Sequence, residues 1–171
     1  MLGCAQCSAR IRARSRVYVM FKKRPASGNN KKSMNYQTID KLKQKEVTGL
    51  FTSVFTSSEG EKEGDLIGSL SSGLASSIDN KEIICFGVYE NETLIASIFF
   101  TRLRFDNPVQ VYMLAPVAVS TEYQGKGIGQ ALINYGLNEL KKRSASVVVT
   151  YGDPSFYSKV GFQELSENVI Q

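Results

Sequence analysis

The chain has 171 residues, of which 42% are hydrophobic and 22% are charged, and this composition suits one globular domain with an apolar core. No run of 18 apolar residues occurs, so nothing in the sequence predicts a membrane span. The formal net charge of +5 is unevenly distributed. Residues 1–33 hold nine of the Lys and Arg residues and no acid, whereas residues 34–171 hold twelve against sixteen acids. The basic character therefore belongs to the N-terminal segment and does not describe the body of the chain.

Residues 1–33, called the leader below, have a composition unlike the rest of the chain. Their longest apolar patch, Val17–Phe21, is too short for the core of a secretory signal peptide. We interpret the leader as a basic segment without packed structure, followed by one domain at residues 34–171. Two alternatives stay open: an Arg-rich organelle transit peptide, and a basic arm that touches nucleic acid.

The chain holds three cysteines and no histidine, which leaves few ligands for a metal. Cys4 and Cys7 form a CxxC pair in the leader, but two thiols without two further ligands are a weak zinc pattern. We therefore expect no metal. An odd number of cysteines without a secretory signal favours a reducing compartment, so the expected location is the cytoplasm. Cys85 lies in an apolar run and is expected to be a small buried residue.

The domain is expected to begin with a strand and two helices. Residues 34–39 predict a short strand, and Asp40 can cap a helix that runs to about Phe55. The polar stretch 56–64 is rich in Ser, Glu and Lys and is interpreted as a loop. Asp65 then precedes a second helix, which contains several glycines and serines.

Three strands follow. Residues 82–89 and 93–105 predict an antiparallel hairpin with its turn at residues 90–92. Asp106-Asn107-Pro108 marks the next turn, and the apolar run Val111–Val119 predicts the next strand.

The last elements alternate between helix and strand. Residues 128–143 have apolar side chains at helical spacing, and Val147–Tyr151 is an apolar run typical of a strand buried on both faces. Pro154 can start a short helix that Gly161 ends, and residues 162–165 begin a final strand. This order predicts an α/β domain: a mixed sheet with helices on both faces and a parallel crossover between residues 111 and 151.

A glycine-rich turn, Tyr123–Gly129, lies between the strand at 111–119 and the helix that begins at Ile128. Backbone N–H groups of such a turn, together with the N-terminus of the helix, can bind a phosphate or pyrophosphate. The turn is not a Walker A loop, because Gly127 follows Lys126 where Ser or Thr is required. A dinucleotide fingerprint is a weaker interpretation, since the glycine spacing is one residue short and no acid follows at the required distance.

A third pattern, Gln/Arg-x-x-Gly-x-Gly/Ala at a helix start after a strand, is matched at every defined position by Gln124–Gly129. Leu114–Val119 precedes the turn, and Gly152-Asp153-Pro154-Ser155-Phe156-Tyr157-Ser158-Lys159-Val160-Gly161-Phe162 follows the helix. Together, residues 111–162 resemble the acyl-CoA-binding core of the GNAT superfamily of N-acetyltransferases. The GDPxFYxxxGF ending is similar to that of a bacterial branch of predicted N-acetyltransferases.

The resemblance implies a GNAT fold and an acetyl-CoA site. The residues that would wrap the pyrophosphate, mainly through backbone N–H groups, are Gln124, Gly125, Lys126, Gly127, Ile128 and Gly129. The side chain of Lys126 could add charge or stay solvated. The residues whose backbone would pair with the pantetheine arm are Val117, Ala118 and Val119. Two parallel strands must part for that arm, and Pro116 fits a bulge there; the alternative is an edge strand that contains a proline.

The resemblance also implies direct attack of an amine on the thioester. Tyr157 matches the tyrosine that gives a proton or hydrogen bond to the departing sulfur; the alternative is an aromatic side chain that only packs on the sheet. Backbone N–H groups near Val117 could stabilise the oxyanion. No general base is chosen: a water chain is as suitable as the carboxylates near the expected pocket, which are Glu82, Glu90, Glu92, Glu122 and Asp153.

The chain ends about ten residues after Gly161, where the family usually adds a further strand on the acceptor side. We therefore expect a C-terminal strand to be missing, or to be supplied by a partner chain in a homodimer. The first functional hypothesis is an acetyl-CoA-dependent N-acetyltransferase acting on an unidentified amine of a small molecule or a protein. The second is a module that binds acyl-CoA without turnover. Nucleic acid is not the expected partner, because the body of the chain is acidic.

Overall fold

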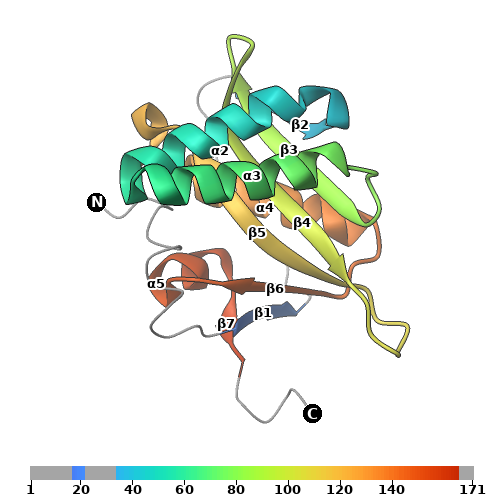
Figure 1. The fold of residues 1–171 in the computed structure, drawn as a ribbon. Coiled ribbons are helices and arrows are strands. Elements are labelled where there is room, and N and C mark those ends of the chain that lie inside the picture. Colours follow the sequence, from blue (N-terminus) through green and yellow to red (C-terminus); the bar gives the residue numbers. More distant parts are fainter. Residues whose placement is uncertain (1–16, 22–33, 166–171) are drawn as a thin grey trace.

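The computed structural model describes residues 17–21 and 34–165, which build one seven-stranded mixed sheet in the order β2-β3-β4-β5-β6-β1-β7 (Figure 1). All neighbouring pairs are antiparallel except β5 and β6, which are parallel. The strands are β1 (Val17–Phe21), β2 (Asn35–Ile39), β3 (Ile83–Glu90), β4 (Thr93–Leu103), β5 (Val111–Val119), β6 (Val147–Tyr151) and β7 (Gln163–Glu164). The α/β class with a mixed sheet is therefore confirmed, and the predicted strands at 34–39, 82–89, 93–105, 111–119 and 147–151 agree with it to within two residues.

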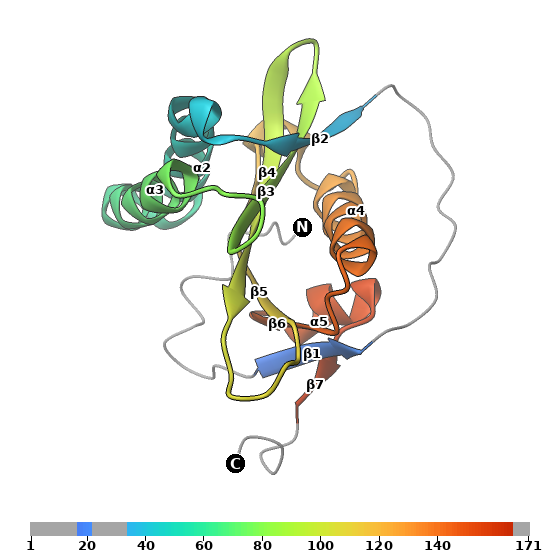
Figure 2. The ribbon, with the colours of Figure 1, turned by 90° about the vertical axis from the view of Figure 1, so that its right-hand side faces the viewer.

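Helices cover both faces of this sheet, as predicted. Helices α2 (Gln44–Glu59) and α3 (Glu61–Ser76) lie on one face, and α4 (Ile128–Lys142) lies on the other (Figure 2). The short helix α5 (Pro154–Tyr157) continues into a 3-10 turn at Ser158–Val160, which ends at Gly161 with a left-handed φ of 92°. Within the described residues, no helix has both the length and the apolarity needed to cross a bilayer.

The loop predicted at residues 56–64 is wrong. Helix α2 continues to Glu59, and only Gly60, with φ 94°, separates it from α3. Asp40 caps a single 3-10 turn ahead of α2, and its Oδ1 accepts from the N–H of Leu42 at 2.8 Å. The sequence looks like a loop because its Ser, Thr and Gly residues have low helix propensity, whereas the packing of α2 against α3 decides the structure.

Small residues allow α2 and α3 to approach closely. A Cβ atom at Gly64 would lie 1.9 Å from Oγ1 of Thr56, and one at Gly68 would lie 2.2 Å from Oγ1 of Thr52. The glycines that weaken the helix pattern in the sequence therefore form the contact that holds this helix pair together.

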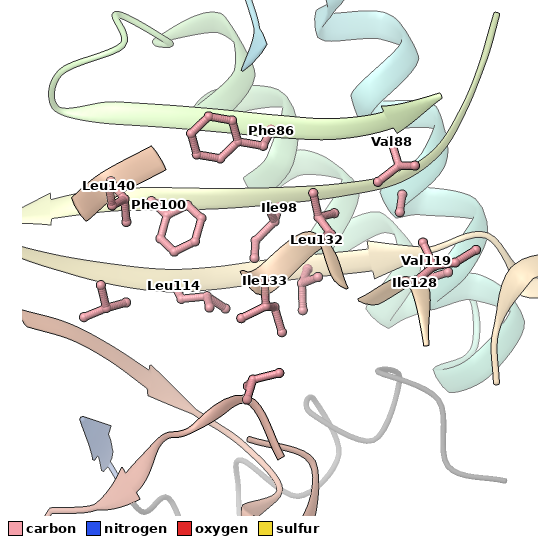
Figure 3. Close-up of a cluster of buried hydrophobic side chains, with 14 of the residues drawn as sticks. Phe86, Val88, Ile98, Phe100, Leu114, Val119, Ile128, Leu132, Ile133 and Leu140 are labelled. Atoms are coloured by element: carbon pink, nitrogen blue, oxygen red, sulfur yellow. The ribbon is translucent and has the colours of Figure 1, made fainter. Parts of the chain in front are cut away.

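The hydrophobic core consists of two clusters, one on each face of the sheet. The cluster under α4 joins residues of β3, β4 and β5 to Ile128, Leu132, Ile133 and Leu140 of the helix (Figure 3). The cluster under α2 and α3 contains Phe51, Phe55 and Phe99 as well as Cys85, which is fully buried as predicted. Strand β6 is less buried than predicted: Val148 and Thr150 are buried, whereas Val147 and Val149 are partly buried and Tyr151 is 39% exposed.

Strand β1 overturns one expectation about the leader. Val17–Phe21 lies between β6 and β7 and pairs antiparallel with both, so these five residues belong to the folded sheet (Figure 1). The interpretation of residues 1–33 as a segment without packed structure is therefore wrong for β1. Its predicted boundary at Met34 follows sequence composition, whereas strand pairing is set by residues far along the chain. The CxxC pair at Cys4 and Cys7 and the expectation of a missing strand after β7 lie outside the described residues.

Candidate acyl-CoA site

The parallel strands β5 and β6 pair over only part of their length. Their register runs from Val111 opposite Val147 to Leu114 opposite Thr150, and there the ladder ends. Oγ1 of Thr150, which is fully buried, donates a hydrogen bond of 3.0 Å to the carbonyl oxygen of Leu114 and holds this last pair together. Beyond it the two strands part, as Figure 1 shows.

A bulge in β5 lies directly after this last pair. Phe99 of β4 stands opposite two residues, Ala115 and Pro116, because the register shifts between Leu114 and Val117. Proline has no N–H to donate to a ladder, so a bulge is where it costs least. The bulge predicted for Pro116 is confirmed. The alternative, an edge strand, is wrong, because β5 lies between β4 and β6.

The bulge sets the direction of the backbone groups that follow. The N–H of Ser120 donates to the carbonyl oxygen of Ile95 in β4 at 2.8 Å, and Ala118 pairs with Ser97. Since successive residues of a strand direct their N–H and C=O groups to opposite sides, those of Val117 and Val119 are directed away from β4. They face the side from which β6 has turned, so an extended ligand could pair as a strand does with the N–H and C=O of Val117 and with the N–H of Val119, whose C=O accepts from Gln124.

The glycine-rich turn continues from β5 into α4. Gly125 and Gly127 have φ of 73° and 77°, a left-handed conformation that favours glycine. The first intrahelical hydrogen bond of α4 runs from the N–H of Ala131 to the carbonyl oxygen of Gly127 at 3.0 Å. The N–H groups of residues 128–130 consequently have no acceptor within the helix and are available at its positive end. This arrangement suits an anion such as a pyrophosphate.

Side chains hold the turn in place. Nε2 of Gln124 donates to the carbonyl oxygen of Val119 at 3.0 Å, and Nζ of Lys126 donates to that of Glu122 at 3.0 Å. The Lys126 ammonium also lies 5.0 Å from the ring centre of Tyr123. The Tyr123 hydroxyl donates in turn to the Glu90 carboxylate, and this hydrogen bond raises the pKa of Tyr123. The sequence analysis did not find the contact of Glu90 with Tyr123, because the two residues meet only when β3 and β5 lie in one sheet.

Tyr157 lies at the end of α5 and is 2% exposed. Its ring packs edge-on against Phe156 at 5.2 Å and against Phe162 at 5.6 Å. Tyr157 belongs to the same buried cluster as Val117 and Ile128, so the structure brings it to the core beneath the parted strands. Its packing role is thus observed, whereas its role as a proton donor stays a prediction.

The carboxylates considered as bases occupy different places. Glu82 binds Arg102 at 3.5 Å and Arg104 at 2.9 Å, and Arg102 pairs with Tyr112 near the start of β5, away from Val117. Asp153 caps α5 by accepting from the N–H of Ser155 at 2.8 Å.

Two further features are the distribution of possible metal ligands and a pocket at the β2 edge of the sheet. No group of three or more His, Cys, Asp or Glu side chains in the described part of the chain could hold a metal ion. An open polar pocket of about 550 Å³ lies at the β2 edge of the sheet and is lined by Asn35, Gln37, Lys43, Tyr89, Asn91 and Glu92. This pocket is separated from β6 by β3, β4 and β5, so it is distinct from the parted strands.

Comparison with known proteins agrees with this geometry. The family model of the acetyltransferase (GNAT) domain matches residues 81–164. The chain is 37% identical over 79 residues to the uncharacterized N-acetyltransferase YjhQ of Escherichia coli K12. This match covers 44% of this chain and 42% of YjhQ. It is 42% identical over 50 residues to the uncharacterized N-acetyltransferase YhbS, covering 29% of this chain and 30% of YhbS. The chain thus spans less than half of these relatives.

Solved structures match over more of the chain. A GNAT family acetyltransferase from Brucella melitensis in complex with acetyl-CoA is 25% identical with a TM-score of 0.62, covering 78% of this chain and 88% of that one. YhbS from E. coli in complex with CoA is 23% identical with a TM-score of 0.63, covering 81% and 73% of the two chains. Residues 81–164 match the family model, and the fold, the parting of β5 from β6 and the glycine-rich turn agree with that match. This chain therefore carries a GNAT acetyltransferase domain.

Proposed function

We propose that the protein is an N-acetyltransferase that moves the acetyl group of acetyl-CoA to a primary amine of a small molecule or protein. The observation that carries this proposal is that Val117 and Val119 direct backbone groups away from β4, on the strand that leads into the glycine-rich turn. Ser120 lies three positions after Val117, roughly 10 Å along the strand. One extended ligand could therefore pair with β5 and reach the N-terminus of α4 with a pyrophosphate.

The residues proposed to hold acetyl-CoA form two groups, each of which contacts a different part of the ligand. Val117, Ala118 and Val119 supply the strand that the pantetheine arm pairs with. The turn Gln124–Gly129 supplies N–H groups to the pyrophosphate, and the α4 dipole adds to this attraction. The acetyl-CoA in the Brucella melitensis structure, which is 25% identical to this chain, supports the same ligand here.

The chemistry requires three tasks of the site. The amine nitrogen attacks the thioester carbon and forms the C–N bond, and the N–H of Val117 is suited to stabilise the oxyanion. The C–S bond then breaks and the thiolate leaves with the electron pair. Tyr157 is proposed to give that thiolate its proton, since a phenol with pKa about 10 and a thiol near 8.5 can exchange one.

The proton lost by the amine must go to water or to a carboxylate. Glu82 is unsuited, because it pairs with two arginines at the other end of β5. Asp153 already accepts the hydrogen bonds that begin α5. A water chain therefore fits the described residues better than either of these carboxylates.

Two measurements test the proposal. Calorimetry with CoA and acetyl-CoA measures binding, and thiol release from acetyl-CoA across a panel of alkylamines and peptides measures transfer. Binding together with amine-dependent thiol release is the expected result. Binding without release from any amine would favour the second candidate, an acyl-CoA-binding module. No binding by folded protein at millimolar CoA would overturn both candidates.

A further inference from the structure

The leader strand β1 lies between β6, which parts from β5 at the proposed site, and β7, which follows Tyr157 in the chain. At one side, Tyr18 of β1 stands opposite Thr150, the last residue of β6 that pairs with β5. At the other side, Tyr18 and Val19 stand opposite Glu164 and Gln163 of β7. Both ladders are antiparallel, so β1 is an interior strand at this end of the sheet.

Strand β7 has β1 as its sheet neighbour, and it follows Tyr157 closely in the chain. The sheet order ends β6-β1-β7, so within the described residues β7 joins the sheet only through β1. Between β7 and α5, the N–H of Phe162 donates to the carbonyl oxygen of Tyr157 at 3.1 Å, and the two rings lie 5.6 Å apart. Any shift of β7 is therefore passed to Tyr157 over a few residues.

The connection from β6 to α5 does not by itself fix the position of Tyr157. It runs through Gly152, with φ 145°, and Asp153, which caps α5. Glycine permits many backbone conformations, so this connection leaves the direction of α5 to be set by its contacts. The pairing of β7 with β1 is one of these contacts and fixes the far end of the segment.

We propose that β1 is a positioning element of the acetyl-transfer site: by pairing with β6 and β7 together, it fixes Tyr157 relative to the point at Thr150 where β5 and β6 part. This inference rests on the proposed function and assigns a role to residues 17–21, which their sequence alone marks as part of a basic leader. Pyrophosphate binding at the turn before α4 does not involve β1. Loss of β1 should thus reduce the chemical step and leave CoA affinity intact.

The test uses the full chain with Val19→Pro, because position 19 lies opposite residues of both neighbouring strands. Proline removes an N–H and does not fit an interior strand. Val19→Ile keeps the N–H and a β-branched side chain and is the matched control. We expect Val19→Pro to lower kcat at least tenfold with the Kd for CoA changed less than twofold, and Val19→Ile to behave as wild type.

Hydrogen exchange gives a readout that does not depend on activity. In Val19→Pro, the backbone amides of residues 149–151 and 163–164 should exchange at least tenfold faster, while those of β3 and β4 stay unchanged. If wild-type protein fails to transfer acetyl groups, the proposed function fails, and this exchange pattern still reports whether β1 holds β7. Unchanged exchange and unchanged kcat in Val19→Pro would overturn the inference.

A second variant covers the case in which Val19→Pro does not fold. Gln163→Pro weakens the same ladder from β7, an exposed edge strand, and so carries less risk for the core. The same fall in kcat with unchanged CoA affinity is expected. Equal losses of kcat and CoA affinity in Gln163→Pro would show a general structural effect and would also overturn the inference.

Discussion

The Tyr123 hydroxyl donates a hydrogen bond to Oε2 of Glu90 and so joins the glycine-rich turn to the hairpin between β3 and β4. The turn of this hairpin is tight: Asn91 and Glu92 have φ of 48° and 64°, as in the type I′ turn that matches the twist of two paired strands. The turn that is proposed to bind pyrophosphate is therefore held by a part of the sheet that precedes it by about thirty residues.

Tyr123→Phe removes this hydrogen bond and is expected to weaken CoA binding threefold to tenfold, because the turn loses one of its supports; kcat should change less than twofold. Calorimetry and steady-state kinetics measure the two effects. Glu90→Ala should give the same result, and Glu92→Ala, two residues along the hairpin, should give none. If the effects of Tyr123→Phe and Glu90→Ala add fully in the double variant, the two side chains do not act together.

Gly127→Ala places a Cβ on a residue with φ 77° just before α4. The described structure has no atom within 4 Å of that Cβ, so the cost is backbone strain of about 1–2 kcal/mol and not a steric clash. We expect at least a tenfold loss of CoA affinity as the N–H groups of the turn move. Gly73→Ala, on the exposed side of α3, is the control, and equal CoA affinities in the two variants would contradict a role for the turn.

Tyr157→Phe keeps the ring packed against Phe156 and Phe162 and removes only the hydroxyl. If Tyr157 protonates the leaving thiolate, kcat should fall on the order of 10²-fold with little change in acetyl-CoA affinity. Tyr112→Phe is a control at the other end of β5, where the hydroxyl donates to the carbonyl oxygen of Lys81. A wild-type rate in Tyr157→Phe would leave Tyr157 with its packing role alone.

The close contact of α2 with α3 predicts opposite effects for two glycine substitutions in the same helix. Gly64→Ala would bring a Cβ within 2.9 Å of the Cα of Thr56, a backbone atom that cannot move aside easily. We expect a loss of stability of about 1–3 kcal/mol from overpacking. Gly73→Ala meets nothing within 4 Å among the described residues and should stabilise α3 by up to about 1 kcal/mol. Denaturant unfolding of both variants measures the difference, and equal midpoints would contradict the packing argument.

Burial raises the pKa of Cys85 to about 12, partly opposed by its contact with the Ser97 hydroxyl. Since the folded protein holds this proton more tightly than the unfolded chain, the contribution to stability is complete below about pH 9 and is lost as the pH rises towards 12. The slope approaches about 1.4 kcal/mol per pH unit in that window. Unfolding between pH 8 and 11 should reveal it, and Cys85→Ala should show a shallower decline.

Cys85 should also resist thiol reagents in the native state, because the thiolate is the reactive form. In a variant with Cys4→Ser and Cys7→Ser, no thiol should react at pH 8 until denaturant is added. Rapid labelling of the folded variant would show that Cys85 is less buried than described.

Local patterns predicted the part of the chain that carries the proposed site. The strand at Val111–Val119 and the start of α4 at Ile128 agree with the structure, because an apolar run and helical spacing act over a few residues. The bulge at Pro116 was equally predictable, since proline lacks the N–H that a central strand needs. The helix boundary between α2 and α3 could not be predicted in this way, because it depends on how Gly64 and Gly68 pack against another helix.

The amino-acid sequence by itself determined the strand at Val111–Val119, the turn before α4 and the resemblance to GNAT acetyltransferases, since each depends on residues close together in the chain. Only the tertiary structure decided that Val17–Phe21 is a strand of the sheet and that Glu90 supports the turn. The reason is that β1 pairs with residues about 130 positions away, and such pairing depends on backbone groups that every residue has. The pattern of side chains predicts that a segment forms a strand, but the strands with which it pairs are set by the folded chain as a whole.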